Sequence, residues 1–154
     1  MPTATTIAAK ITALLQQVFY PRTDSPNAAA RAVRNGAVAG WIMVAVHFVL
    51  GAVLIILIVA EQERVSGDAL IPATIQLFVA FAYGALATYA WRGARSSIVT
   101  MLILLVLDTL LVMARVHSLD PQFAIHLIAL ILALGGARGA FAHAAYQRNT
   151  DAGP

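Results

Sequence analysis

Four long apolar runs dominate the pattern of hydrophobic and polar positions along the chain. They cover residues 37–60, 70–91, 97–114 and 123–146, with charged residues gathered around their ends. A helix of about 20 apolar residues crosses the hydrocarbon core of a bilayer. Because backbone polar groups find no water in lipid, such runs must be helical. The pattern predicts an all-α fold, an integral membrane four-helix bundle in which short loops make neighbouring helices antiparallel.

A shorter amphipathic pattern precedes the first run, over residues 3–20. Lys10 and the glutamines lie on the opposite face, so the segment is too short and too polar to span, and we expect a helix lying in the membrane interface. A helix packed on protein, or a partly ordered tail, is the alternative. The apolar positions recur at helical spacing: Ile7, Ile11, Leu14, Leu15, Val18 and Phe19.

Helix-breaking and helix-capping residues between this segment and the first run predict where the next helix begins. Pro21 pushes Tyr20 out of the helical region and ends the amphipathic helix. Ser25 and Pro26 then have the residue types of an N-cap and a first helical position. The resulting division is a cytoplasmic amphipathic segment, a membrane domain and a cytoplasmic tail. These units cover residues 1–35, 36–146 and 147–154.

Composition supports the membrane interpretation and removes several others. The chain is 60% hydrophobic and 11% charged, whereas soluble domains have roughly 45–50% apolar and about 25% charged residues. It contains no cysteine, which excludes disulfides, thiolate metal sites and iron–sulfur ligation. The net charge of +3 comes from arginines that flank the apolar runs. We therefore expect the lipid bilayer as partner and no nucleic acid.

The distribution of basic residues predicts the orientation. Eight of the ten fall on one side of the predicted membrane, and only Arg64 and Arg115 fall on the other. Because basic residues gather on the cytoplasmic side, both termini should be cytoplasmic. The eight are Lys10, Arg22, Arg31, Arg34, Arg92, Arg95, Arg138 and Arg148.

Asp108 is the residue most out of place, because it lies inside the third run. A carboxylate at the centre of the membrane costs about 2.5–3.5 kcal/mol on the insertion scale, so it should face protein or water. It shares a helical stripe with Ser97, Met101 and Arg115. His47 in the first run lies at a similar depth, and the two side chains are a candidate intramembrane pair. One interpretation is a proton-accepting pair in a transporter or channel, and the other is an interhelical hydrogen bond that fixes packing.

Four further polar residues are candidates to support this pair: Gln76, Tyr83, Arg115 and His126. His47 with His126 could in principle ligate haem, or a metal ion together with Asp108. Counting from the ends of the runs places these histidines about two helical turns apart in depth. On that basis we expect no metal and no cofactor. The remaining histidines, His117 and His143, are predicted near the outer and cytoplasmic surfaces.

Small residues recur every fourth position on one face of several runs, which lets helix backbones approach closely. The sequence predicts a compact bundle with lipid outside. The spacings Gly36 to Gly40 and Gly135 to Gly139 also match the GxxxG motif of helix dimers, so a homodimer or a larger membrane complex is an alternative. The predicted packing glycines are Gly36, Gly40, Gly51, Gly84, Gly135, Gly136 and Gly139.

The end of the last run, Gly-Ala-Arg-Gly-Ala-Phe-Ala-His over residues 136–143, resembles the end of a class of small four-span bacterial membrane proteins. This resemblance, with an alanine- and arginine-rich, lysine-poor composition, implies the bacterial inner membrane and carries no chemistry. The chain lacks the first-span glutamate of small multidrug transporters and the residue pattern of four-span glutathione-linked eicosanoid enzymes.

The sequence therefore predicts a multi-pass membrane protein with a packing, interaction or accessory-subunit role. A small proton-coupled transporter or channel using Asp108 and His47 is the rival. A membrane enzyme or haem protein is a third class. We expect no enzymatic activity, because no nucleotide-binding, zinc-protease or serine-hydrolase motif occurs in the sequence.

Overall fold

The computed structural model describes residues 9–10, 12–13, 16, 21–60, 67–115 and 121–151. Four long helices follow one another: α2 Pro26–Ala60, α3 Gly67–Trp91, α4 Arg95–Arg115 and α5 Pro121–Asp151. The described residues contain no strand, so the prediction of an all-α four-helix bundle is confirmed. Most of the amphipathic helix predicted over residues 3–20 lies outside the described residues.

Helix α2 begins at the predicted cap. The Ala28 amide donates a hydrogen bond to the Ser25 hydroxyl oxygen at 3.3 Å, and Pro26 is the first helical residue. The helix then runs through Asn35 and Gly36 without a break. As a result, the predicted boundary between a segment 1–35 and a membrane domain falls inside one continuous helix.

A tight turn joins α3 to α4. Gly93 has φ of +90°, in the left-handed region that a residue with a Cβ rarely adopts. The Gly93 amide donates to the Ala90 carbonyl and the Ala94 amide to the Tyr89 carbonyl, at 2.9 and 3.0 Å. These two bonds cap the last turn of α3 and let α4 start only four residues after α3 ends.

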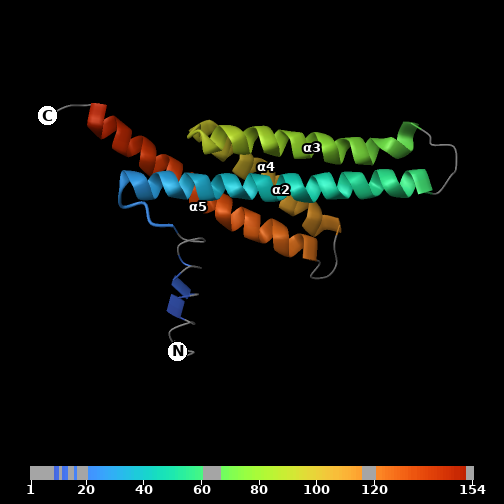
Figure 1. Ribbon diagram of the computed structural model, residues 1–154, viewed down its shortest axis with the longest axis horizontal. Coiled ribbons are helices and arrows are strands. Elements are labelled where there is room, and N and C mark those ends of the chain that lie inside the picture. Colours follow the sequence, from blue (N-terminus) through green and yellow to red (C-terminus); the bar gives the residue numbers. More distant parts are fainter. Residues whose placement is uncertain are drawn as a thin grey trace.

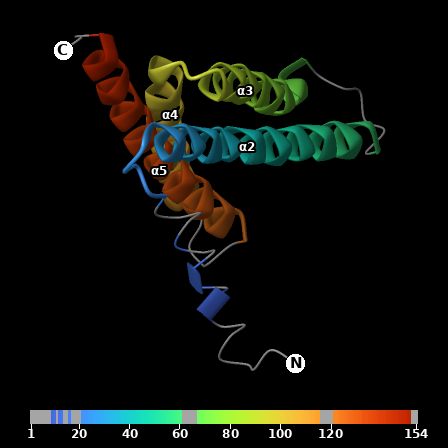
Figure 2. The ribbon, with the colours of Figure 1, turned by 60° about the vertical axis from the view of Figure 1, so that its left-hand side comes forward.

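The arrangement of the four helices is centred on α2 (Figure 1). It packs against α3 on one side and against α5 on the other, while α4 packs on α5 and α3. Helices α4 and α5 cross α2 and α3 obliquely, as both views show (Figures 1 and 2). The hairpin of α2 and α3 also extends past α4 and α5 at the end formed by Ala60 and Gly67 (Figure 1).

Glycines set the register between α2, α4 and α5. A Cβ on Gly36 would lie 2.6 Å from the Gly136 Cα and 2.7 Å from the Ile98 Cδ1. A Cβ on Gly139 would lie 2.5 Å from the Ala32 Cβ. Such distances are shorter than any real Cβ contact, so only glycine permits this approach. Gly36, Ile98 and Gly136 therefore form one level at which three helices meet.

The other predicted packing glycines differ in how closely they are approached. A Cβ on Gly40 would meet Met101 Sδ at 2.6 Å and one on Gly51 would meet Leu77 at 3.0 Å, whereas one on Gly84 would meet only Val44, at 3.5 Å. Gly135 is buried. The Gly36–Gly40 face is thus filled within a single chain, as is Gly139, and a homodimer would have to use another surface.

The outside of the bundle is strongly apolar. Phe78 and Phe81 of α3 are 72% and 76% exposed, and Ile56 of α2 is 65% exposed. Apolar surface of this extent on a soluble monomer is rare. All four helices are long and apolar enough to cross a membrane. The chain is a multi-pass membrane protein by these two criteria.

Two of the helices are longer than a bilayer requires. At 35 and 31 residues, α2 and α5 extend about 52 and 46 Å, against about 30 Å of hydrocarbon. They stay together beyond the glycine level, where the Tyr146 hydroxyl donates a hydrogen bond to the Thr23 carbonyl at 3.1 Å. The start of α2 and the end of α5 therefore project from the same side of the bundle.

Candidate functional site

The candidate site lies about three helical turns from the close contact between Gly36 and Gly136. Gly36, Ile98 and Gly136 meet at one level. Ten or eleven residues further along these helices, on the side away from the chain ends, stand His47, Asp108 and His126. On a helix this separation is about 15 Å. Because α2, α4 and α5 meet at Gly36, Ile98 and Gly136, each of them also brings one polar residue to a common depth about three turns away. We call His47, Asp108 and His126 the polar centre.

The three side chains are in direct contact. His47 Nε2 lies 2.8 Å from Asp108 Oδ2, and His126 Nε2 lies 3.3 Å from the same oxygen. The two imidazole rings are edge to face, with centroids 6.3 Å apart. Both histidines are buried, while the Asp108 side chain keeps 20% of its surface exposed. One carboxylate oxygen is therefore shared by two imidazole nitrogens inside the apolar part of the bundle.

The far nitrogen of each ring is also held by an oxygen atom. His47 Nδ1 lies 2.5 Å from Gln76 Oε1 of α3, and His126 Nδ1 lies 2.8 Å from the backbone carbonyl of Gln122, one turn earlier on α5. These contacts fix the orientation of both rings. Through Gln76 the arrangement ties all four helices together.

These contacts determine where hydrogens can sit. A backbone carbonyl only accepts hydrogen bonds, so His126 Nδ1 must donate to Gln122. Gln76 Oε1 accepts from His47 Nδ1 in the same way. In neutral imidazole the other nitrogen, Nε2, then presents a lone pair. Both Nε2 atoms point at a carboxylate oxygen that has only lone pairs when ionised. The polar centre therefore needs a positive species between these atoms, either protons or a metal ion.

Tyr83 of α3 covers one side of the polar centre. Its ring stacks on His47 at a centroid distance of 5.6 Å and an interplanar angle of 12°. Its hydroxyl is buried and has no hydrogen-bond partner among the described residues, although it lies within the electrostatic field of Asp108. A buried hydroxyl without a partner costs free energy. The Tyr83 hydroxyl is therefore a polar group that faces Asp108 from α3.

The prediction that His47 and His126 differ by about two helical turns in depth is wrong. Counting from the ends of the apolar runs assumes that those ends are level. In the structure the α2–α3 hairpin overhangs α4 and α5 (Figure 1), so His47 lies thirteen residues from the end of α2 whereas His126 lies five from the start of α5. The depths of His47 and His126 are therefore compatible with a shared metal ion.

The remaining sequence candidates lie elsewhere. Met101 is fully buried, and Ser97 is partly buried at the start of α4. The side chain of Arg115 lies outside the described residues, as does His117. His143 is partly buried near the far end of α5. Gln122 carries no signal in the sequence, because it contributes its backbone carbonyl and any residue could supply that group.

The donor set has the chemistry of a transition-metal site. Two imidazoles and one carboxylate are ligands of Zn²⁺ in catalytic sites and of non-haem Fe²⁺, and both leave positions open. Bond lengths of about 2.0–2.2 Å at zinc imply ligand atoms roughly 3.4 Å apart. The three ligand atoms all lie within 4.8 Å of one another. A ligating histidine almost always donates its other N–H to a carboxylate, carbonyl or water, as both rings do here.

Comparison with known proteins gives no further guidance. No family model, curated protein or solved structure matches the chain. Function must therefore be argued from the polar centre itself.

Proposed function

We propose that the protein is a membrane-embedded metal-binding protein that holds one divalent first-row transition ion at the polar centre. His47 and His126 would ligate through Nε2 and Asp108 through Oδ2. The single observation that carries this proposal is the convergence of these three atoms with both Nδ1 positions already used as donors. The protein would leave one or more coordination positions open.

Tyr83 and the exposure of Asp108 support an open coordination position. The Tyr83 hydroxyl lies beside Asp108, where it could donate to or accept from a water bound to the metal. The Asp108 side chain is 20% exposed, so the protein does not enclose it completely. Zn²⁺ and Fe²⁺ both suit imidazole and carboxylate ligands.

The two interpretations drawn from the sequence stay predictions beside this proposal. In the packing or accessory role, the polar centre holds only protons and serves as an interhelical lock. A proton-coupled transporter usually carries discontinuous helices at its binding site. Helices α2, α4 and α5 run unbroken past the polar centre, and this favours a fixed site over an alternating one.

Metal binding can be tested with Co²⁺ and Zn²⁺ on the purified full chain in detergent. We expect one ion per chain and visible absorption bands from bound Co²⁺. Asp108→Asn and His126→Ala should remove both signals, while His143→Ala, a histidine outside the centre, should keep them. Helical circular dichroism and elution volume should not change in Asp108→Asn, because asparagine preserves the shape of the side chain.

Two results would overturn the metal proposal. One is the absence of stoichiometric Zn²⁺ or Co²⁺ in the wild-type protein, which would leave the interhelical lock as the better account. The other is an equal loss of metal in His143→Ala and His126→Ala, which would mean that the ions bind adventitiously to histidines in general.

For the location, we infer the inner membrane of a bacterium, with both termini in the cytoplasm. The excess of basic residues around the chain ends and the α3–α4 turn supports this orientation. The resemblance of residues 136–143 to the end of small bacterial membrane proteins supports the choice of membrane.

A further inference from the structure

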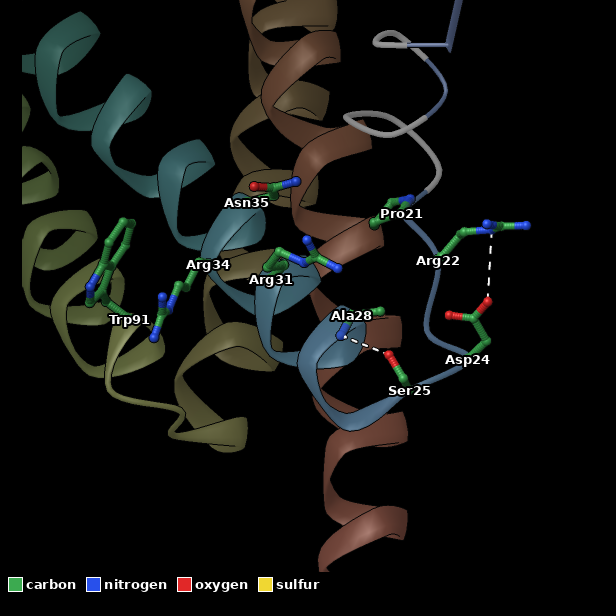
Figure 3. Close-up of a pocket in the computed structure, with 9 residues that line it drawn as sticks. All are labelled: Pro21, Arg22, Asp24, Ser25, Ala28, Arg31, Arg34, Asn35 and Trp91. Carbon is green, nitrogen blue, oxygen red and sulfur yellow. Dashed lines mark hydrogen bonds and ion pairs between the residues drawn. The ribbon is translucent and has the colours of Figure 1, made fainter.

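The cytoplasmic end proposed for the bundle contains a basic hollow beside the start of α2 (Figure 3). Its volume is about 510 Å³, and its charged lining residues are Arg22, Asp24, Arg31 and Arg34. Asp24 Oδ2 lies 3.8 Å from Arg22 Nε, so the acidic residue among the described lining residues pairs with Arg22. Arg31 and Arg34 remain as excess positive charge, and Figure 3 shows Arg34 reaching toward Trp91 of α3.

A second hollow of about 230 Å³ adjoins the first and shares Arg34 and Trp91 with it. Arg92, Arg95 and His143 also line it, and none of the described residues that line it is acidic. Arg34 and Trp91 therefore stand where the two hollows meet, and Arg92 lines the second hollow next to Trp91. Paired guanidinium groups in a concave site are the side chains best suited to bind a phosphate group.

An apolar groove leads away from these arginines into the depth of the bundle. A hollow lined by Trp41, Thr88, Trp91 and Arg92 connects the basic region to a larger groove of about 700 Å³ between α2 and α3. Trp41, Phe48 and Phe81 form its walls, and Gly84 leaves its floor open. From Arg34 to Phe48 the helix rises about 21 Å, which exceeds the depth of about 15 Å of one leaflet of hydrocarbon.

We propose that this surface binds one anionic phospholipid. Its phosphate would lie at Arg34, Trp91 and Arg92, and one acyl chain would fill the groove between α2 and α3. Charge complementarity selects the anionic headgroup, because the described residues that line the groove include Arg92 and none that is acidic. The proposal is independent of the metal centre, which lies further along the bundle.

Trp41 and Trp91 are the only tryptophans of the chain, and both line the proposed site. Bromine atoms on an acyl chain quench tryptophan fluorescence at short range. The experiment uses vesicles of equal parts phosphatidylglycerol and phosphatidylcholine, with dibrominated chains on either one lipid or the other. We expect stronger quenching when phosphatidylglycerol carries the bromines. Headgroup composition and total charge are identical in the two vesicles, so the difference reports selection at the site.

Variants separate this site from general attraction to an anionic surface. Each arginine near a headgroup should contribute about fivefold in lipid preference, so Arg34→Gln combined with Arg92→Gln should abolish the difference between the two labels. Arg148→Gln, on the exposed last turn of α5, should preserve it. Equal quenching by both labels in the wild type, or an equal loss in Arg148→Gln, would overturn the proposal.

A second variant fills the groove without removing charge. Gly84→Phe projects a ring into the space occupied by the proposed acyl chain, and its Cβ would meet only Val44 at 3.5 Å. Quenching by brominated phosphatidylglycerol should fall. Ile75→Phe adds a ring to an exposed position of α3 outside the groove, and quenching should stay at the wild-type level. If Gly84→Phe is quenched as strongly as the wild type, the groove does not hold the acyl chain.

Discussion

At the scale of single residues, the oxygen atoms that accept hydrogen bonds from His47 Nδ1 and His126 Nδ1 are as important for metal binding as the proposed ligands. Gln76 Oε1 and the Gln122 carbonyl each face an Nδ1 atom. They keep the hydrogen on that nitrogen and the lone pair on Nε2, which is the form that binds a metal ion. Only Gln76 can be changed by substitution, because the other group belongs to the backbone.

Replacing Gln76 should therefore weaken metal binding without touching a ligand. We expect Gln76→Leu to lower the affinity for Zn²⁺ by about 10–100-fold, the usual effect of losing an outer hydrogen-bond partner. Gln76→Glu keeps an acceptor at the same place and should retain the affinity. Titration with Zn²⁺ against a competing chelator measures both. Equal affinity in Gln76→Leu and the wild type would show that Gln76 only supports packing.

The same residues show how far sequence reasoning reaches. Polar residues inside apolar runs are visible in any sequence, so His47, Asp108 and Gln76 could be named. Their meeting could not be derived, because it depends on how three helices slide relative to one another. Counting from the ends of the runs misplaced His126. Counting from Gly36 and Gly136, the level at which the helices touch, would have placed it correctly, but the sequence does not say which small residues meet.

At the scale of helices, the glycine level makes the packing of α2 sensitive to one methyl group. A Cβ on Gly36 would meet the backbone of α5 at 2.6 Å, whereas one on Gly84 would meet a flexible Val44 methyl at 3.5 Å. Backbone cannot move aside without separating the two helices. The same substitution should therefore have opposite effects at these two positions.

We expect Gly36→Ala to lower the free energy of unfolding by about 1–3 kcal/mol, the usual cost of overpacking. Gly84→Ala should leave it unchanged or raise it by up to ~1 kcal/mol, because alanine favours the helix over glycine. Reversible unfolding in mixed micelles, followed by circular dichroism, compares the two. Equal stability of both variants would contradict the close contact of α2 with α5.

The presence and order of the four helices were predictable, because an apolar run of this length can satisfy its backbone hydrogen bonds in lipid only by forming a helix. Hydropathy alone did not give their full lengths. The first apolar run begins at residue 37, whereas α2 begins at Pro26, where the residue types of Ser25 and Pro26 predict a helix start. Hydropathy marks only the part of a helix that meets the acyl chains, and the basic turns that continue into water carry no such mark. Arg31 and Arg34 are helical because Ser25 and Pro26 start the helix before them.

At the scale of the whole molecule, orientation rests on the distribution of basic residues. Arg22, Arg31 and Arg34 flank the start of α2, and Arg92 and Arg95 flank the α3–α4 turn. These segments lie on the same side of the bundle because α2 and α3 are antiparallel. Arg148 lies in the last turn of α5, which projects from this side as well. The positive-inside rule then predicts that this side faces the cytoplasm.

Reporter fusions test this orientation in a bacterial host. Green fluorescent protein fused after Pro154 should fluoresce, because it folds in the cytoplasm. Alkaline phosphatase inserted between Ala60 and Gly67 should be active, because it needs the oxidising periplasm. The reverse pattern of the two signals would invert the topology, and the groove between α2 and α3 would then open its basic end to the periplasm.

The hydrogen bond from Tyr146 to Thr23 has a consequence for how the chain can be connected. Because the start of α2 and the end of α5 lie close together, a short peptide could join residue 151 to residue 21. A circularly permuted chain opened at Gly93 would then start with α4, end with α3 and keep the helix contacts described here. The order of the helices along the polypeptide is thus separable from their order in space.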